Sequence, residues 1–157
     1  MKKFLAIILV FLLSGFSSVS AFAWDYPEFP EPTDVQTEIL PDGSLFVVTI
    51  TTNREQKGPV QSITSTKTGS LIRNGITLWE ISLQASFDYN GTTAYCTAAT
   101  SGYTIYNSAW GLHSRNVSKN GNTATANFTF YRYAAGTVVE TVNRTLTMSC
   151  SASGVVV

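Results

Sequence analysis

The chain has 157 residues with ten basic and ten acidic side chains, and its net charge is zero when the single histidine is neutral. A balanced charge without any basic run argues against nucleic acid or an anionic membrane as a partner, because both recruit clustered Lys and Arg. Charged residues make up only 13%, whereas Thr, Ser, Asn and Gly are abundant, which is typical of β-rich extracellular domains.

Residues 1–23 have the features of a secretory signal peptide. Lys2 and Lys3 precede an apolar run at 4–13, and Ala21-Phe22-Ala23 fits the small-x-small cleavage pattern. The run is shorter than the roughly 20 apolar residues that a spanning helix needs, so we expect no transmembrane segment after cleavage. Removing 23 of the 157 residues leaves 134, enough for one domain, which we expect to be secreted and extracellular.

Residues 24–43 are predicted to form an acidic, proline-containing extended arm. The segment has six carboxylates, four prolines and no basic residue. Proline removes backbone donors and favours extended backbone, so we expect a solvated leader before the domain. The alternative is an arm that binds calcium or docks on a partner through Trp24, Tyr26 and Phe29, although this proline spacing opposes the folding of oxygen ligands around one ion.

Residues 44–157 are predicted to form one β-sandwich domain. Its clearest strand is 76–89, where apolar residues from Trp79 to Tyr89 alternate with polar ones over eleven positions. This period of two indicates a strand with one buried face and one wet face. Leu78 then faces outward, unless a β-bulge precedes Trp79. Asn90-Gly91 follows and is typical of a type I′ hairpin turn.

Shorter alternating runs between turn signals predict the other strands. They cover 45–52, 60–67, 92–100, 103–106, 112–118, 123–131 and 138–150, with a loop at 53–59 and turns at Asn74-Gly75, Asn120-Gly121 and Ala134-Ala135-Gly136. Arg144 has inward parity in the last strand and breaks its pattern, so either a bulge re-aims it or it lies at a sheet edge. Seven to nine strands without any helical period predict an all-β fold, an antiparallel immunoglobulin-like sandwich.

The two cysteines, Cys96 and Cys150, are predicted to form one disulfide. Export to an oxidising compartment permits the bond, and each cysteine shares parity with apolar neighbours in its strand. In the chain-entropy model, closing a loop of about 55 residues would stabilise the fold by about 4 kcal/mol. Two unpaired thiols are the alternative.

The segment from about Lys67 to Gly154 resembles a group of small secreted proteins from Gram-positive bacteria. The residues that carry the resemblance are Phe87-Asp-Tyr-Asn-Gly91, Cys96-Thr97, Tyr106-Asn-Ser-Ala-Trp110, Ser118-Lys-Asn-Gly121 and Leu146-Thr-Met-Ser-Cys150-Ser151. The group has no established activity. The resemblance therefore implies a bacterial, exported protein, and it implies no catalytic or binding residues.

The sequence has no motif for catalysis, for a metal or for a cofactor. His113, the only histidine, has no neighbouring Cys, Asp or Glu, so we expect it to be a solvent-facing strand residue. Glu80 and Asp88 share a strand face but lie about 26 Å apart, whereas paired glycosidase carboxylates lie within about 10 Å. A carboxylate pair formed by Glu80 and Glu140 on different strands is an alternative that the sequence leaves open. We expect a protein that is not an enzyme and needs no cofactor, and a hydrolase with a site built from scattered residues is the alternative.

Tyr95, Tyr131 and Tyr133 have outward parity and form the candidate ligand face. Exposed tyrosines on a flat sheet stack on sugar rings or anchor a protein partner. The alternative is simple packing between neighbouring strands. We predict a non-catalytic binding or surface-associated β-sandwich whose partner is a cell-surface glycan or protein. A carbohydrate-binding module that uses these tyrosines is the more specific hypothesis.

Overall fold

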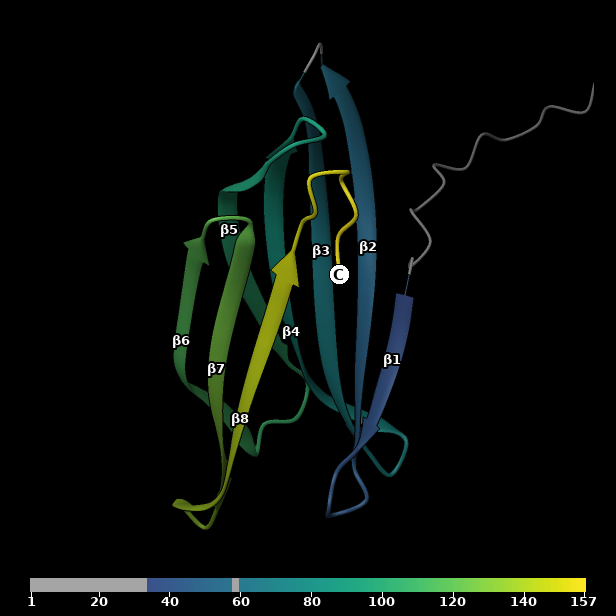
Figure 1. Ribbon diagram of the computed structural model, residues 1–157. Coiled ribbons are helices and arrows are strands. Elements are labelled where there is room, and N and C mark those ends of the chain that lie inside the picture. Colours follow the sequence, from purple (N-terminus) through teal and green to yellow (C-terminus); the bar gives the residue numbers. More distant parts are fainter. Residues whose placement is uncertain (1–33, 58–59) are drawn as a thin grey trace, which may run out of the picture.

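A computed structural model describes residues 34–57 and 60–157 (Figure 1). These ranges contain eight strands and no helix, which confirms the all-β prediction and its strand number. The strands are β1 (Asp34–Ile39), β2 (Leu45–Lys57), β3 (Val60–Arg73), β4 (Ile76–Tyr89), β5 (Ala94–Ile105), β6 (Trp110–Asn120), β7 (Thr123–Ala134) and β8 (Thr137–Ser149). The predicted signal peptide at 1–23 and the first part of the predicted arm, 24–33, lie outside the described residues.

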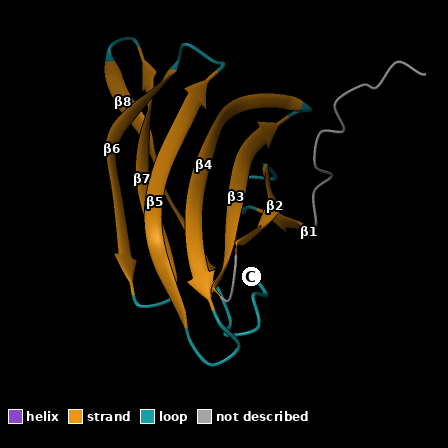
Figure 2. Cartoon of the chain, turned by 90° about the horizontal axis from the view of Figure 1, so that it is seen from above, coloured by secondary structure: helices purple, strands orange, loops and turns teal. Residues whose placement is uncertain are grey.

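The strands form two antiparallel sheets, in the orders β1-β2-β3-β4-β5 and β6-β7-β8. Consecutive strands are neighbours within each sheet, and loops join them (Figure 2). The chain passes from the larger to the smaller sheet once, between β5 and β6. The two layers match the predicted sandwich. The immunoglobulin-like part is not confirmed, because the described strands lack the Greek-key connections of that fold.

β4 is a central strand of the core, as its alternating sequence predicts. Its register with β3 shifts between the pairs Leu71↔Trp79 and Ile72↔Thr77, so Leu78 is an extra residue on β4. Leu78 and Trp79 are both buried. The predicted alternative of a β-bulge before Trp79 is therefore confirmed, since the bulge lets two successive apolar side chains enter the core.

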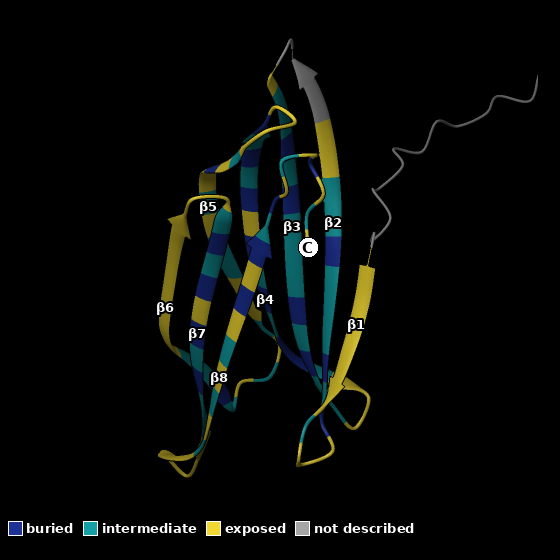
Figure 3. Ribbon diagram, in the orientation of Figure 1, coloured by how far each residue is buried: buried dark blue, intermediate teal, exposed yellow. Residues whose placement is uncertain are grey.

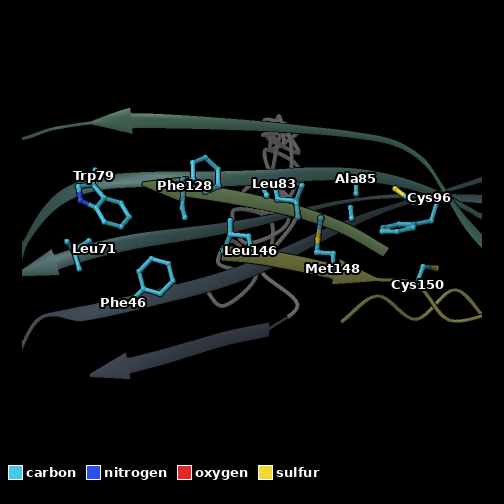
Figure 4. Close-up of a cluster of buried hydrophobic side chains, with 14 of the residues drawn as sticks. Phe46, Leu71, Trp79, Leu83, Ala85, Cys96, Phe128, Leu146, Met148 and Cys150 are labelled. Carbon is cyan, nitrogen blue, oxygen red and sulfur yellow. The ribbon is translucent and has the colours of Figure 1, made fainter. Parts of the chain in front are cut away.

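The inner faces of the two sheets form one hydrophobic core, part of which is shown in Figure 4. Trp79 of β4 stacks on Phe130 of β7 with 4.3 Å between ring centres. Trp110, the first residue of β6, meets Trp79 edge-on at 6.2 Å. Gly69 of β3 leaves room for Phe46, because a Cβ there would lie 2.5 Å from the Phe46 ring. Aromatic packing thus joins both sheets.

The Arg144 side chain lies on the inner face of β8, as its parity predicts, and no bulge re-aims it. The register of β7 with β8 shifts only between Arg132 and Tyr133, far from Arg144. β8 is an edge strand, and the Arg144 guanidinium lies 4.8 Å from the centre of the Phe46 ring. The sheet-edge alternative is therefore confirmed. The charged group itself therefore covers the Phe46 ring, in a cation–π contact.

Two hairpins are closed by two-residue turns. Asn74 and Gly75 have φ values of 53° and 75° and join β3 to β4. Ala135 and Gly136, with φ values of 47° and 78°, join β7 to β8. Left-handed backbone at both central residues matches the twist of the flanking strands.

The predicted type I′ turn at Asn90-Gly91 is wrong. Four residues, 90–93, separate β4 from β5, and of the Asn-Gly pair only Gly91 has a positive φ. The Asn90 side-chain oxygen Oδ1 instead accepts hydrogen bonds from the backbone N–H groups of Thr92 at 3.0 Å and Thr93 at 2.9 Å. The Asn90 side chain therefore stabilises a longer loop. Asn is common in turns because its side chain makes such hydrogen bonds and also because it tolerates left-handed backbone.

Two segments that were predicted to lie outside strands belong to the larger sheet. Residues 53–57 of the predicted loop continue β2 and pair with β3. Residues 34–39 of the predicted arm form β1, which pairs with β2. All six residues of β1 are exposed (Figure 3), so the strand has no buried face to mark it in the sequence. Part of the predicted arm, 34–39, is therefore an edge strand of the larger sheet.

The predicted disulfide is not formed, because Cys96 and Cys150 are both free, buried thiols. They lie at the same end of the core (Figure 4), where the Cys96 N–H donates to the Gly121 carbonyl and the Cys150 N–H to the Asn122 carbonyl. Each thiol donates instead to a backbone carbonyl within two residues of itself. Shared parity turned both side chains inward, but parity alone does not bring two sulfur atoms into bonding distance.

Candidate aromatic binding site

Tyr131, Tyr133 and His113 form an aromatic cluster on the outer face of the smaller sheet. Alternation along β7 turns Phe130 into the core, so that Tyr131 and Tyr133 point outward. Tyr131 stacks on His113 with 4.2 Å between ring centres and 18° between ring planes. Tyr133 meets Tyr131 edge-on at 6.4 Å. Three rings from two neighbouring strands are therefore in contact on one surface.

A β-bulge in β6 places His113 in the aromatic cluster. The residues on either side of His113 pair with Phe130 and Thr129, which are consecutive in β7, so His113 is the extra residue. A bulge re-aims the side chain that it carries, and His113 is exposed beside Tyr131. The prediction of a solvent-facing histidine is confirmed. Its contact with Tyr131 had no signal in the sequence.

Gly111 leaves the space that Tyr133 occupies. A Cβ on Gly111 would lie 3.2 Å from Cε2 of Tyr133, which is tighter than an ordinary contact. Tyr133 is still 42% exposed. Within the described part of the chain, no side-chain hydrogen bond involves the hydroxyl of Tyr131 or Tyr133. The cluster thus offers apolar ring surface together with hydroxyl and imidazole groups that can bond to a ligand.

Tyr95 does not belong to the aromatic cluster, although it is 60% exposed. It lies on β5 of the larger sheet, next to Cys96, whose N–H donates to Gly121 in the turn before β7. Tyr131 lies ten residues after Gly121, roughly 33 Å along a strand. Of the three predicted ligand-face residues, the structure brings together Tyr131 and Tyr133 and places Tyr95 near the opposite end.

The acidic residues considered for catalysis accept hydrogen bonds from their neighbours. Glu80 accepts from the Ser70 hydroxyl at 3.2 Å, and Asp88 accepts from the Ser62 hydroxyl at 2.7 Å. Both lie on the long strand β4, eight residues apart. Glu140 does not take part in a carboxylate pair with Glu80 but binds arginines. Nothing in these contacts prepares a carboxyl group for proton transfer to a substrate.

A charged cluster of Asp42, Arg73, Arg132 and Glu140 lies at one end of the sandwich. Glu140 bonds to Arg73 at 2.9 Å and to Arg132 at 2.7 Å, and Asp42 bonds to the same Arg73 nitrogen, Nη2. The hydrogen bond from Arg73, followed by that from Arg132, holds the pKa of Glu140 below its ordinary value. An ionised carboxylate held in this way is a poor general acid at neutral pH, so the cluster is a structural brace.

The described residues contain no group of three or more His, Cys, Asp and Glu side chains that could hold a metal ion. No helix in the same part of the chain is long and apolar enough to cross a membrane.

Comparison with known proteins assigns no family to the chain. No family model matches it, and no curated protein matches it. Among solved structures, the chain is similar to a hypothetical protein from Listeria monocytogenes EGD-e, with a TM-score of 0.41 and 18% identity over 74% of this chain and 85% of that chain. A likeness this distant carries no inference about function.

Proposed function

We propose that this protein is a secreted, non-catalytic β-sandwich that binds a cell-surface glycan through the aromatic cluster. The observation that carries the proposal is the contact of three exposed or half-exposed rings on one outer sheet face. An aromatic side chain that packs against a ligand buries a large surface area, while only a few of its torsion angles have to become fixed. Apolar ring atoms beside hydroxyl and imidazole groups are suited to the apolar face and the hydroxyls of a pyranose.

The surroundings of the aromatic cluster support a polar ligand rather than an apolar one. Thr129 donates to Asn143 and Thr145 donates to Asn127, each at 2.8 Å, so hydroxyls and amides lie on the same outer face of the smaller sheet. A sugar presents both an apolar ring face and many hydroxyls. The predicted signal peptide and the resemblance to Gram-positive secreted proteins favour wall polysaccharide or peptidoglycan as the source of the glycan.

Binding to insoluble polysaccharides tests the proposal. Purified protein is mixed with peptidoglycan and with other wall glycans, and the bound fraction is measured over a concentration range. The variant Tyr131→Ala is expected to weaken binding at least about fivefold, the effect of losing about 1 kcal/mol from a contact residue. Tyr95→Ala is the control, because it removes an exposed tyrosine from the other sheet, whereas Tyr131 is half-buried.

Two results would oppose the glycan proposal. Equal binding by the wild type, Tyr131→Ala and Tyr95→Ala would place the contact elsewhere on the surface. Binding that survives a large excess of free sugar, but depends on Tyr131, would indicate a protein partner on the same rings.

A further inference from the structure

A groove runs along one open side of the sandwich, between the edge strand β8 and the inner face of β1 and β2. The smaller sheet ends at β8, while the larger sheet continues past it through β2 to β1 (Figure 1). The groove is lined by Gln36 and Glu38 of β1, Phe46 and Val48 of β2, Lys67 of β3, and Thr145 and Thr147 of β8. It is apolar at its floor and polar at its rims.

The edge of β8 presents backbone groups toward this groove. Ser149 exchanges two hydrogen bonds of 3.1 Å with Val157, so its N–H and C=O point away from β7. Backbone direction repeats every second residue in an antiparallel strand, so Thr147 and Thr145 point their N–H and C=O groups the same way. The Thr147 carbonyl accepts from the Lys67 ammonium at 2.9 Å. The strand edge beyond Val157 is thus exposed to an added chain.

Two cations lie at the groove without an ion pair to any other described residue. Lys67 donates to a backbone carbonyl, and Arg144 lies over Phe46 with a buried Nε that has no hydrogen-bond partner among the described residues. Glu38 lies on the rim of the groove with Lys67, and the charge of Asp34, at the start of β1, acts on Lys67. Burial lowers the pKa of Lys67, and Asp34 opposes that effect. A further negative charge in the groove would be favourable.

We propose that residues 24–33 of this same chain bind in the groove, with their backbone against the edge of β8. The segment joins β1 directly at Asp34, which lies near Lys67. Ten extended residues reach about 33 Å, enough to run the length of the groove. The segment contains Asp25, Glu28 and Glu31 and no basic residue, which complements Lys67 and Arg144.

The composition of the segment suits this place in other respects. Trp24, Tyr26 and Phe29 provide apolar side chains for a floor made by Phe46 and Val48. Prolines in the segment are tolerated in an added edge strand where the missing N–H faces away from the neighbouring strand. In general, proline favours extended backbone, and a chain that is already restricted in this way loses less entropy on binding.

Tryptophan quenching and amide hydrogen exchange test the proposal on the chain that carries residues 24–33. Trp79 and Trp110 are 0% and 5% exposed, so acrylamide quenching of the folded protein reports mainly on Trp24. We expect Trp24 to be shielded and the Thr145 and Thr147 amides to be protected about tenfold or more relative to an unpaired strand edge. Both effects should fall in the double variant E28Q/E31Q, which leaves the described strands unchanged.

The controls separate docking from general effects of charge. Lys67→Gln should expose Trp24, whereas Arg115→Gln should not, because Arg115 performs the equivalent backbone contact, to the Ser101 carbonyl, on the other open side. Free quenching of Trp24 with fast exchange at Thr145 and Thr147 would overturn the proposal. Protection that appears only as protein concentration rises would also overturn it, since a second copy would then cover the edge.

Discussion

Trp79 and Phe130 stack face to face across the two sheets, with 4.3 Å between ring centres and 5° between ring planes. Trp79 belongs to the larger sheet and Phe130 to the smaller one, and both are fully buried. Phe46 and Trp110 meet the Trp79 ring at its sides, each at 6.2 Å. The pair is therefore one of the core contacts that hold the sheet carrying the aromatic cluster to the larger sheet.

Phe130→Ala should destabilise the domain by about 3–5 kcal/mol, because it removes a buried ring and leaves a cavity beside Trp79. The quantity to measure is the free energy of unfolding in urea. Thr129→Ala, on the outer face of the same strand, is the control and should cost far less. A loss below about 1 kcal/mol for Phe130→Ala would mean that the stack does not join the sheets.

Ala135→Gly should stabilise the protein by about 0.5–1 kcal/mol. Ala135 has a φ of 47°, and a Cβ in left-handed backbone costs about 1–2 kcal/mol, part of which the greater freedom of glycine in the unfolded chain offsets. Gly136→Ala, at a φ of 78° in the same turn, should have the opposite sign. Urea unfolding of both variants checks the pair, and a loss of stability for Ala135→Gly contradicts the turn geometry.

The pH dependence of stability should depend on Glu140. Its pKa is lowered from 4.5 in the folded state, first by the hydrogen bond from Arg73 and then by Arg132, so the unfolded chain takes up the proton earlier as the pH falls. The contribution of Glu140 to the free energy of unfolding is therefore complete above about pH 4.5, the unfolded-state pKa. It is lost as the pH falls through the lower pKa of the folded state. Between about pH 6 and pH 3, the wild type should lose more stability than Glu140→Gln. Parallel curves for the two proteins would contradict this role.

Cys96 and Cys150 should react slowly with iodoacetamide in the folded protein. Desolvation raises the pKa of both thiols, which keeps them in the unreactive protonated form. Unfolding without a reductant should expose both thiols, and intact mass should then show two modifications. A chain that takes up no label after unfolding would have its cysteines joined in a disulfide, contrary to the structure.

The fold could be predicted where one face of a strand is buried and the other is wet. The alternation from Trp79 to Tyr89 identified β4 because its inner residues lie in the core. β1 was missed because all of its residues are exposed, so no periodic signal exists. The end of β2 at 53–57 was missed for a related reason, since its sequence is polar and its strand conformation comes from pairing with β3.

The outward direction of the candidate side chains could be predicted, but which of them lie together could not. Parity along a strand turned Tyr131 and Tyr133 outward, because Phe128 and Phe130, at the alternate positions before them, face the core. Parity gives no information about which sheet a strand joins, so Tyr95 was placed with them although it lies near the opposite end of the other sheet. The bulge that brings His113 onto Tyr131 depends on pairing between strands, which a single sequence does not show.

The most direct test of the glycan-binding claim is a titration of the folded protein with soluble wall-glycan fragments, followed through the amide signals in NMR spectra. We expect saturable shifts around Gly111 and His113 of β6 and around Tyr131 and Tyr133 of β7, with none around Tyr95. Saturable shifts confined to other surfaces, or no shift with any fragment at concentrations that saturate the insoluble glycan, would contradict the claim.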